Sequence, residues 1–77
     1  MAEKIFSERL RAIREERNLS QHELATVSNV NRSQIAKFEL GKANPTLDSL
    51  VDIAFALEVE LSDLMPMFRY RDERAAG

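Results

Sequence analysis

Four polar side chains lie on a short helix predicted over residues 32–40, and their types suit hydrogen bonding to the edges of nucleic-acid bases. They are Arg32, Ser33, Gln34 and Lys37. An arginine can donate two hydrogen bonds to a guanine, a glutamine can pair with an adenine, and a serine is short enough to allow close approach. The pattern favours a helix that reads the major groove of DNA, although a merely polar surface helix would show the same periodicity.

The residues before this helix predict a helix-turn-helix that would present it to DNA. Ser20 can cap a preceding helix, and Glu23, three residues later, completes a capping box. Asn29 can end that helix in a left-handed conformation, and Asn31 caps the helix that follows. The side chains expected to face inward on and between the two helices are Leu24, Ala25, Val27, Val30, Ile35 and Phe38.

Helical spacing of apolar residues also predicts a first helix over about residues 4–17. Phe6, Leu10 and Ile13 recur there at the spacing that places side chains on one face. At the far end of the third helix, Gly41 stands where a left-handed residue is usual. No strand-like alternation of apolar and polar residues is sustained anywhere, so we expect an all-α fold, a compact five-helix bundle.

Two further helices complete that bundle. Thr46 caps the fourth helix, and Ser62 caps a short fifth helix whose length is limited by Pro66. We expect one DNA-binding domain over residues 1–68 and a mobile tail over 69–77, which has no apolar face. The fifth helix is expected to contain Leu64 and Met65, and the inward-facing residues expected on the fourth helix are Leu47, Leu50, Ile53, Ala54 and Leu57.

Composition limits the possible functions. The chain has 77 residues and no cysteine, so no disulfide or thiolate zinc site can stabilise it. It has one histidine, His22, and no glycine-rich phosphate loop, which disfavours an enzyme, a metal site or a cofactor. No apolar run is long enough to span a membrane and the N-terminus lacks a signal sequence, so we expect a soluble cytoplasmic protein without a small-molecule ligand.

The formal net charge of -2 is unevenly distributed along the chain. Residues 1–42 carry eight basic and six acidic side chains, whereas residues 43–68 carry five acidic side chains and no basic one. Such a division would let one end approach phosphates while the other faces away from them. Charges that merely cover solvated helix faces remain the alternative.

From about Glu8 to Leu64 the sequence resembles the helix-turn-helix domain of the phage repressor and Cro type, also called the XRE family. The resemblance rests on the collective spacing of Arg9-Leu10-Arg11, Leu19-Ser20-Gln21-His22-Glu23-Leu24-Ala25, Phe38-Glu39-Leu40-Gly41-Lys42 and Asn44-Pro45-Thr46-Leu47. It implies a five-helix, all-α domain that binds double-stranded operator DNA as a twofold dimer.

The resemblance also implies roles for individual residues. Arg14 and Glu39 match a pair that forms an internal ion pair between the first and third helices. The positions that match base-contacting residues are Arg32, Ser33 and Lys37, with Gln34 beside them as a base or phosphate contact. The positions that match or adjoin contacts to the phosphate backbone are Gln21, Lys42, Asn44, Thr46 and Arg14.

Two apolar positions depart from the family pattern. Leu40 occupies a place where the family usually shows arginine or asparagine. Phe55 occupies a position that is usually turned outward, and Val51 lies four residues earlier on the same stripe. The residues expected to bury a contact with a second copy are Val51, Phe55, Leu61, Met65 and Phe68. The alternative is that the fifth helix or the tail folds back over Phe55.

These features predict a sequence-specific transcriptional regulator that acts as a homodimer on a palindromic operator. The small size is similar to that of controller proteins of restriction-modification systems and of short phage-type repressors. Without a ligand-binding domain, the concentration of the dimer would set operator occupancy. Two alternatives remain open: an antitoxin that binds a protein toxin as well as DNA, and a bridging protein with a vestigial helix-turn-helix.

Overall fold

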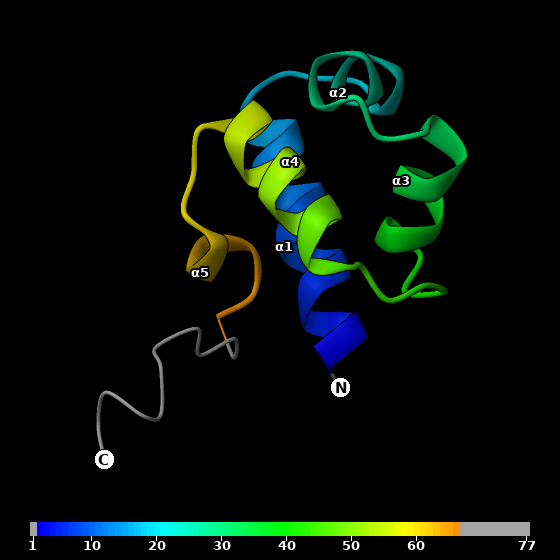
Figure 1. Ribbon diagram of the computed structural model, residues 1–77, viewed down its shortest axis with the longest axis vertical. Coiled ribbons are helices and arrows are strands. Elements are labelled where there is room, and N and C mark those ends of the chain that lie inside the picture. Colours follow the sequence, from blue (N-terminus) through cyan, green and yellow to red (C-terminus); the bar gives the residue numbers. More distant parts are fainter. Residues whose placement is uncertain (1, 67–77) are drawn as a thin grey trace.

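Five helices form the part of the chain that the structure, a computed structural model, describes, namely residues 2–66 (Figure 1). No strand occurs within these residues, so the all-α prediction is confirmed. Phe68 and the tail from Arg69 to Gly77 lie outside the described residues. The helices are α1 (Ala2–Glu16), α2 (Gln21–Ser28), α3 (Arg32–Glu39), α4 (Leu47–Leu57) and α5 (Leu61–Leu64).

The packing of the helices places α3 and α5 on different sides of the domain. Helix α2 packs on both α3 and α4, α1 packs on both α3 and α5, and α4 packs on α5. In Figure 1, α3 lies at one side of the view and α5 at the other, with α1 and α4 between them. The helix predicted to read DNA therefore lies away from the helix predicted to join two copies.

The core takes apolar side chains from all five helices. Phe6 of α1 and Phe38 of α3 meet edge to face, with their ring centroids 5.5 Å apart, which joins the first and third helices. Full burial of one such side chain contributes roughly 1.5–3 kcal/mol to the free energy of folding. The buried apolar residues are Phe6, Leu10, Ile13, Leu24, Val30, Ile35, Phe38, Leu50, Ile53, Ala54, Leu57 and Leu64.

Most of the helix ends predicted from the sequence are found. The Ser20 hydroxyl accepts a hydrogen bond from the Glu23 amide at 2.9 Å, and the Glu23 carboxylate accepts one from the Ser20 amide at 2.8 Å. Asn31 and Thr46 cap α3 and α4, and Asn29 has the left-handed conformation expected of it. These ends define where α2, α3 and α4 begin, and therefore which residues α3 exposes.

Two predictions of inward-facing residues are wrong. Val27 is 57% exposed, because the inward face of α2 runs through Leu24 and Ser28, four residues apart, and Val27 lies beside it. Leu47 is 48% exposed. As the first residue of α4, it has a side chain that leans toward the helix N-terminus and away from the core contacts made by later turns.

The predicted cap of the fifth helix is also wrong. Helix α5 begins two residues earlier than expected, with Glu60 rather than Ser62 at its N-cap position. The Asp63 carboxylate accepts a hydrogen bond from the Glu60 amide at 2.9 Å, which closes this end of the helix. The helix ends at Leu64, and Met65, which precedes Pro66, has a non-helical backbone with φ -128° and ψ 80°.

Candidate nucleic-acid interface

Helices α2 and α3 pack against each other across the turn formed by residues 29–31, which is the geometry of a helix-turn-helix. Val30 is buried in this turn, and half-buried Ala25 packs against the same core. Leu24, Ile35 and Phe38 are buried beneath the pair. The helix-turn-helix therefore rests on the main core of the domain, which fixes the direction in which α3 points.

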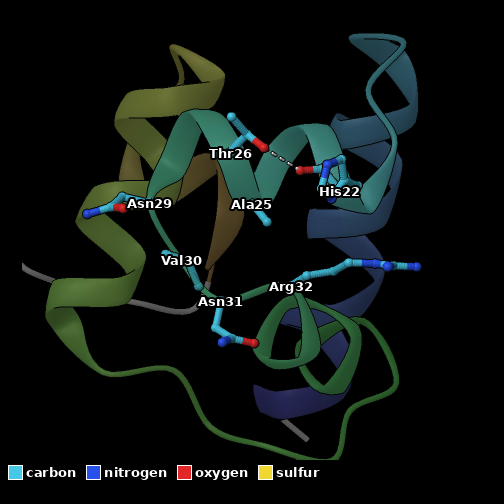
Figure 2. A pocket seen from close by; sticks show the side chains of 7 residues that line it. All are labelled: His22, Ala25, Thr26, Asn29, Val30, Asn31 and Arg32. Atoms are coloured by element: carbon cyan, nitrogen blue, oxygen red, sulfur yellow. Dashed lines mark hydrogen bonds between the residues drawn. The ribbon is translucent and has the colours of Figure 1, made fainter.

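The exposed face of α3 carries two unpaired cations. Arg32, Ser33 and Lys37 are exposed, and Gln34 is half-buried. Within residues 2–66, neither Arg32 nor Lys37 makes a hydrogen bond or ion pair. Figure 2 shows the Arg32 side chain extended away from the first turn of α3. Both charges are therefore available to an external partner.

A buried ion pair holds α1 against the C-terminal end of α3. Arg14 donates from Nε to Glu39 Oε2 at 2.6 Å and from Nη2 to Glu39 Oε1 at 2.9 Å. Its Nη1 donates to the Leu19 carbonyl at 2.7 Å, so all three nitrogens of the guanidinium bond within the chain. The side chains are only 11% and 4% exposed, respectively, which makes this a largely buried pair.

The Glu39 carboxylate also anchors the start of α2. The side-chain amide of Gln21 donates to Glu39 Oε1 at 3.0 Å. The hydrogen bond to Glu39 is the main reason that the pKa of Arg14 is raised above its ordinary value, and burial opposes this shift. Arg14 therefore stays charged at any physiological pH, and one carboxylate joins the ends of α1, α2 and α3.

The positions expected to contact phosphates lie at helix ends and in the α3–α4 loop. Lys42 and Asn44 are exposed, and Lys42 is unpaired within the described residues. At the start of α4, the exposed Thr46 accepts a hydrogen bond from the Ser49 amide at 3.1 Å. The N-terminus of an eleven-residue helix thus lies beside the loop, an end whose dipole favours anions.

Helix α4 exposes apolar side chains away from α3. Phe55 is 85% exposed, and Val51 on the same stripe is also exposed. Leu61 and Met65 are half-buried because they pack partly on the chain's own core. The alternative that α5 folds back over Phe55 is wrong for the described residues. Leu40, at the C-terminal end of α3, is likewise exposed.

A shallow hollow that the sequence analysis did not anticipate lies between α2 and the start of α3. Figure 2 shows the side chains around it, and Ala25, Val30 and Arg32 are among them. Its other lining residues, which the sequence analysis had not grouped together, are His22, Thr26, Asn29 and Asn31. No sequence signal brings them together, since α2 and α3 meet only through tertiary packing.

The described residues offer no metal-binding cluster of three or more histidine, cysteine, aspartate or glutamate side chains. No helix within residues 2–66 combines the length and apolar character needed to cross a membrane. His22 is exposed on α2.

Known proteins share both the sequence and the fold. The chain is 40% identical over 58 residues to the immunity repressor protein of Bacillus phage phi105, covering 75% of this chain and 40% of the repressor. It is 33% identical to the control protein C.SmaI of Serratia marcescens over 91% of this chain and 83% of that protein. It spans about a third to a half of the length of several other curated relatives.

The fold matches a solved controller protein. The crystal structure of the restriction-modification controller protein C.AhdI from Aeromonas hydrophila superposes with a TM-score of 0.79 at 35% identity, covering 82% of this chain and 96% of that one. Residues 10–64 match the sequence model of the HTH_3 family, which is described as Helix-turn-helix. Both findings confirm the resemblance predicted from the sequence. The chain belongs to the helix-turn-helix family HTH_3.

Proposed function

We propose that this chain binds double-stranded operator DNA through α3 and regulates transcription as a homodimer on a palindromic site. The observation that carries the proposal is the exposed face of α3, where unpaired cations lie on a helix fixed by a buried ion pair. A rigid helix with free donors on its outer side can enter the major groove and contact base edges.

The proposed base contacts come from the first two turns of α3. Arg32 lies at its start and Lys37 five residues further along. Arginine and lysine are the usual partners of guanine, and glutamine suits adenine. The proposed base-contacting residues are Arg32, Ser33, Gln34 and Lys37.

The proposed phosphate contacts surround that helix. Gln21 lies at the first position of α2, and its side chain is held by Glu39. Arg14 has every guanidinium nitrogen bonded within the chain, so we assign it to the supporting framework rather than to phosphate. The proposed phosphate-contacting residues are Gln21, Lys42, Asn44 and Thr46.

A second copy of the chain is the proposed partner of the α4 stripe. Phe55 is the most exposed large apolar side chain among the described residues. In a single chain such an exposed side chain adds little to the stability of the fold, whereas burial against a partner would remove its apolar surface from water. An isologous contact through α4 and the adjoining α5 would use Val51, Leu61 and Met65 as well. Such a dimer would present two α3 helices to successive turns of one DNA face.

The named relatives suggest the kind of regulator. A phage immunity repressor and restriction-modification control proteins share the helix-turn-helix with this chain. We propose a cytoplasmic regulator of this kind, with no catalytic step and no small-molecule ligand. The alternative proposal is an antitoxin whose acidic α4–α5 segment binds a protein partner.

Selection of bound duplexes from random DNA tests this proposal directly. We expect an enriched inverted repeat whose half-sites lie about one helical turn apart, roughly 34 Å between centres. Failure to enrich any motif would contradict sequence-specific binding. Enrichment of a single half-site without symmetry would contradict the dimer while leaving DNA recognition intact.

A further inference from the structure

We propose that Asn31 fixes the hydroxyl of Ser33 as a hydrogen-bond acceptor, so that Ser33 selects bases that offer an amino group. The preferred bases would be adenine, through N6, or cytosine, through N4, over guanine and thymine on the same strand. This inference rests on the proposed function, because it concerns which base one residue of α3 prefers. Asn31 would act as a positioning residue without touching DNA itself.

The identity of the Asn31 atom that faces Ser33 follows from two hydrogen bonds. The Ser33 amide donates to Asn31 Oδ1 at 2.8 Å, and the Ser33 hydroxyl lies 2.6 Å from the same atom. A backbone amide can only donate, so its partner must be the amide oxygen and not the amide nitrogen. Figure 2 shows this oxygen turned toward the first turn of α3 and the nitrogen turned away.

The direction of the second hydrogen bond is then determined. An amide oxygen can only accept, so the Ser33 hydroxyl must donate its proton to Asn31. A serine hydroxyl has one proton, and that proton is used inside the chain. What remains for an external partner is the acceptor capacity of the hydroxyl oxygen.

Ser33 is placed to use that capacity on a base. It is exposed at the second position of α3, and Lys37, one turn later on the same stripe, is exposed as well. In the major groove, adenine and cytosine each present an amino donor, whereas guanine and thymine present carbonyl acceptors at the corresponding place. Only the amino bases complement a hydroxyl whose proton is already committed.

A carbonyl at that position would require a rearrangement. Either two acceptors would face each other, or the hydroxyl would leave Asn31 and turn its proton outward. The second route gives up the internal hydrogen bond, whose net value corresponds to roughly a twofold to tenfold change in affinity. We therefore expect the amino bases to bind about twofold to tenfold more tightly than the keto bases at one position of each half-site.

Three variants and four duplexes test the proposal. Ser33→Ala removes the hydroxyl and leaves the backbone cap in place. Asn31→Gly removes the acceptor but keeps a residue that N-cap positions tolerate. Asn31→Asp is the matched control, since its carboxylate also accepts both hydrogen bonds. Affinities are measured on duplexes that carry each of the four base pairs at the position where Ser33→Ala changes the wild-type preference, with folding checked by circular dichroism.

The expected result is a specific change in base preference. Wild type and Asn31→Asp should both favour adenine and cytosine over guanine and thymine on one strand. Asn31→Asp should bind all four duplexes more weakly than wild type, because its added negative charge repels DNA. In Asn31→Gly the ratio should fall toward one, because the freed hydroxyl can donate to the keto bases. The inference would be overturned if folded Asn31→Gly kept the wild-type ratio of affinities for the amino and keto bases. It would also be overturned if wild type preferred a pair of bases other than adenine and cytosine. Absence of any sequence preference in wild type would instead contradict the proposed function.

Discussion

Residues 21–42 and residues 47–64 expose different kinds of side chain. The first region presents unpaired Arg32, Lys37 and Lys42, while its exposed acid Glu23 is bound to the Ser20 amide. The second region presents carboxylates and the apolar stripe of Val51 and Phe55. The difference supports the two partners proposed above, because a polyanion suits the first region and an apolar surface such as a second copy suits the other.

The helices of these two regions also end differently. Both α3 and α4 close with the same pair of backbone hydrogen bonds: Gly41 to Phe38 and Lys42 to Lys37 in α3, and Glu58 to Phe55 and Val59 to Ala54 in α4. Both need a left-handed residue, which α3 supplies as Gly41 and α4 as Glu58. A side chain with a Cβ is unfavourable there, so the end of α4 is strained and that of α3 is not.

The largest expected effect comes from breaking the framework of the first region. Glu39→Ala leaves the charge of Arg14 buried without a partner, which should lower the free energy of unfolding by about 3–5 kcal/mol. For a domain of this size we expect the melting temperature to fall by more than about 10 °C. Thermal unfolding followed by circular dichroism measures this effect.

The control for this variant is an exposed ion pair on the same α1 helix. Arg11 and Glu15 lie 3.2 Å apart with both side chains exposed, so Arg11→Ala should change stability by only about 0–1 kcal/mol. Similar melting temperatures for Glu39→Ala and Arg11→Ala would mean that the Arg14–Glu39 pair is not buried as the structure shows.

In the second region, a charge placed in the apolar stripe should disrupt the proposed dimer. Phe55→Glu should weaken self-association by about 2 kcal/mol or more, because a central aromatic residue of an interface is replaced by a carboxylate. Since Phe55 is exposed in the single chain, the fold itself should be unaffected. Sedimentation velocity over a concentration series measures the monomer–dimer equilibrium.

A substitution of an exposed valine outside the stripe tests whether self-association depends on the stripe itself or on exposed apolar side chains in general. Val27→Glu changes another exposed apolar residue, on α2, and should leave self-association as it is in wild type. A wild-type chain that remains monomeric at high micromolar concentration would remove the basis for the proposed dimer.

The smallest effect concerns the two helix ends. Glu58→Gly relieves the left-handed backbone at φ 60° and should stabilise the fold by about 0.5–1 kcal/mol after allowing for the greater freedom of the unfolded chain. Gly41→Ala should destabilise the fold by a similar amount, because alanine is unfavourable at the φ of 73° found there. Steric overlap adds nothing, since the new Cβ would make only an ordinary contact with Ser7 Oγ, at 3.8 Å. Urea unfolding measures the free energy of unfolding of both variants. If both variants are stabilised, or both destabilised, the ends of α3 and α4 do not differ in backbone strain as described.

The sequence predicts the starts of α2, α3 and α4, which depend on local chemistry, but not the start of α5. Ser20, Asn31 and Thr46 cap their helices because their side chains bond amides only a few residues away. Burial is less local: Val27 and Leu47 are exposed because tertiary packing decides which face turns inward. Glu58 carries no signal at all, since glutamate is not a residue type that favours a left-handed helix end.

The features of the candidate site likewise fall into those that the sequence predicts and those that only the tertiary structure reveals. The residue types on α3 and the positions of Arg14 and Glu39 follow from the sequence and the family resemblance. The hydrogen bond from Gln21 to Glu39 joins α2 to α3, so only the tertiary structure reveals it. The bond from Ser33 to Asn31 is local, and an asparagine N-cap followed two residues later by a serine is a signal that could have indicated it.

The most direct test of the central claim, that α3 reads DNA, is a salt titration of Arg32→Ala and Lys42→Ala on operator and random duplexes. Arg32→Ala should lose about 1–3 kcal/mol mainly on the operator, so the ratio of the two affinities narrows. Lys42→Ala should weaken both duplexes alike and reduce the salt slope by roughly one unit. If Arg32→Ala leaves the affinity ratio intact, α3 does not read DNA through Arg32, and base recognition must be reassigned to Ser33, Gln34 and Lys37.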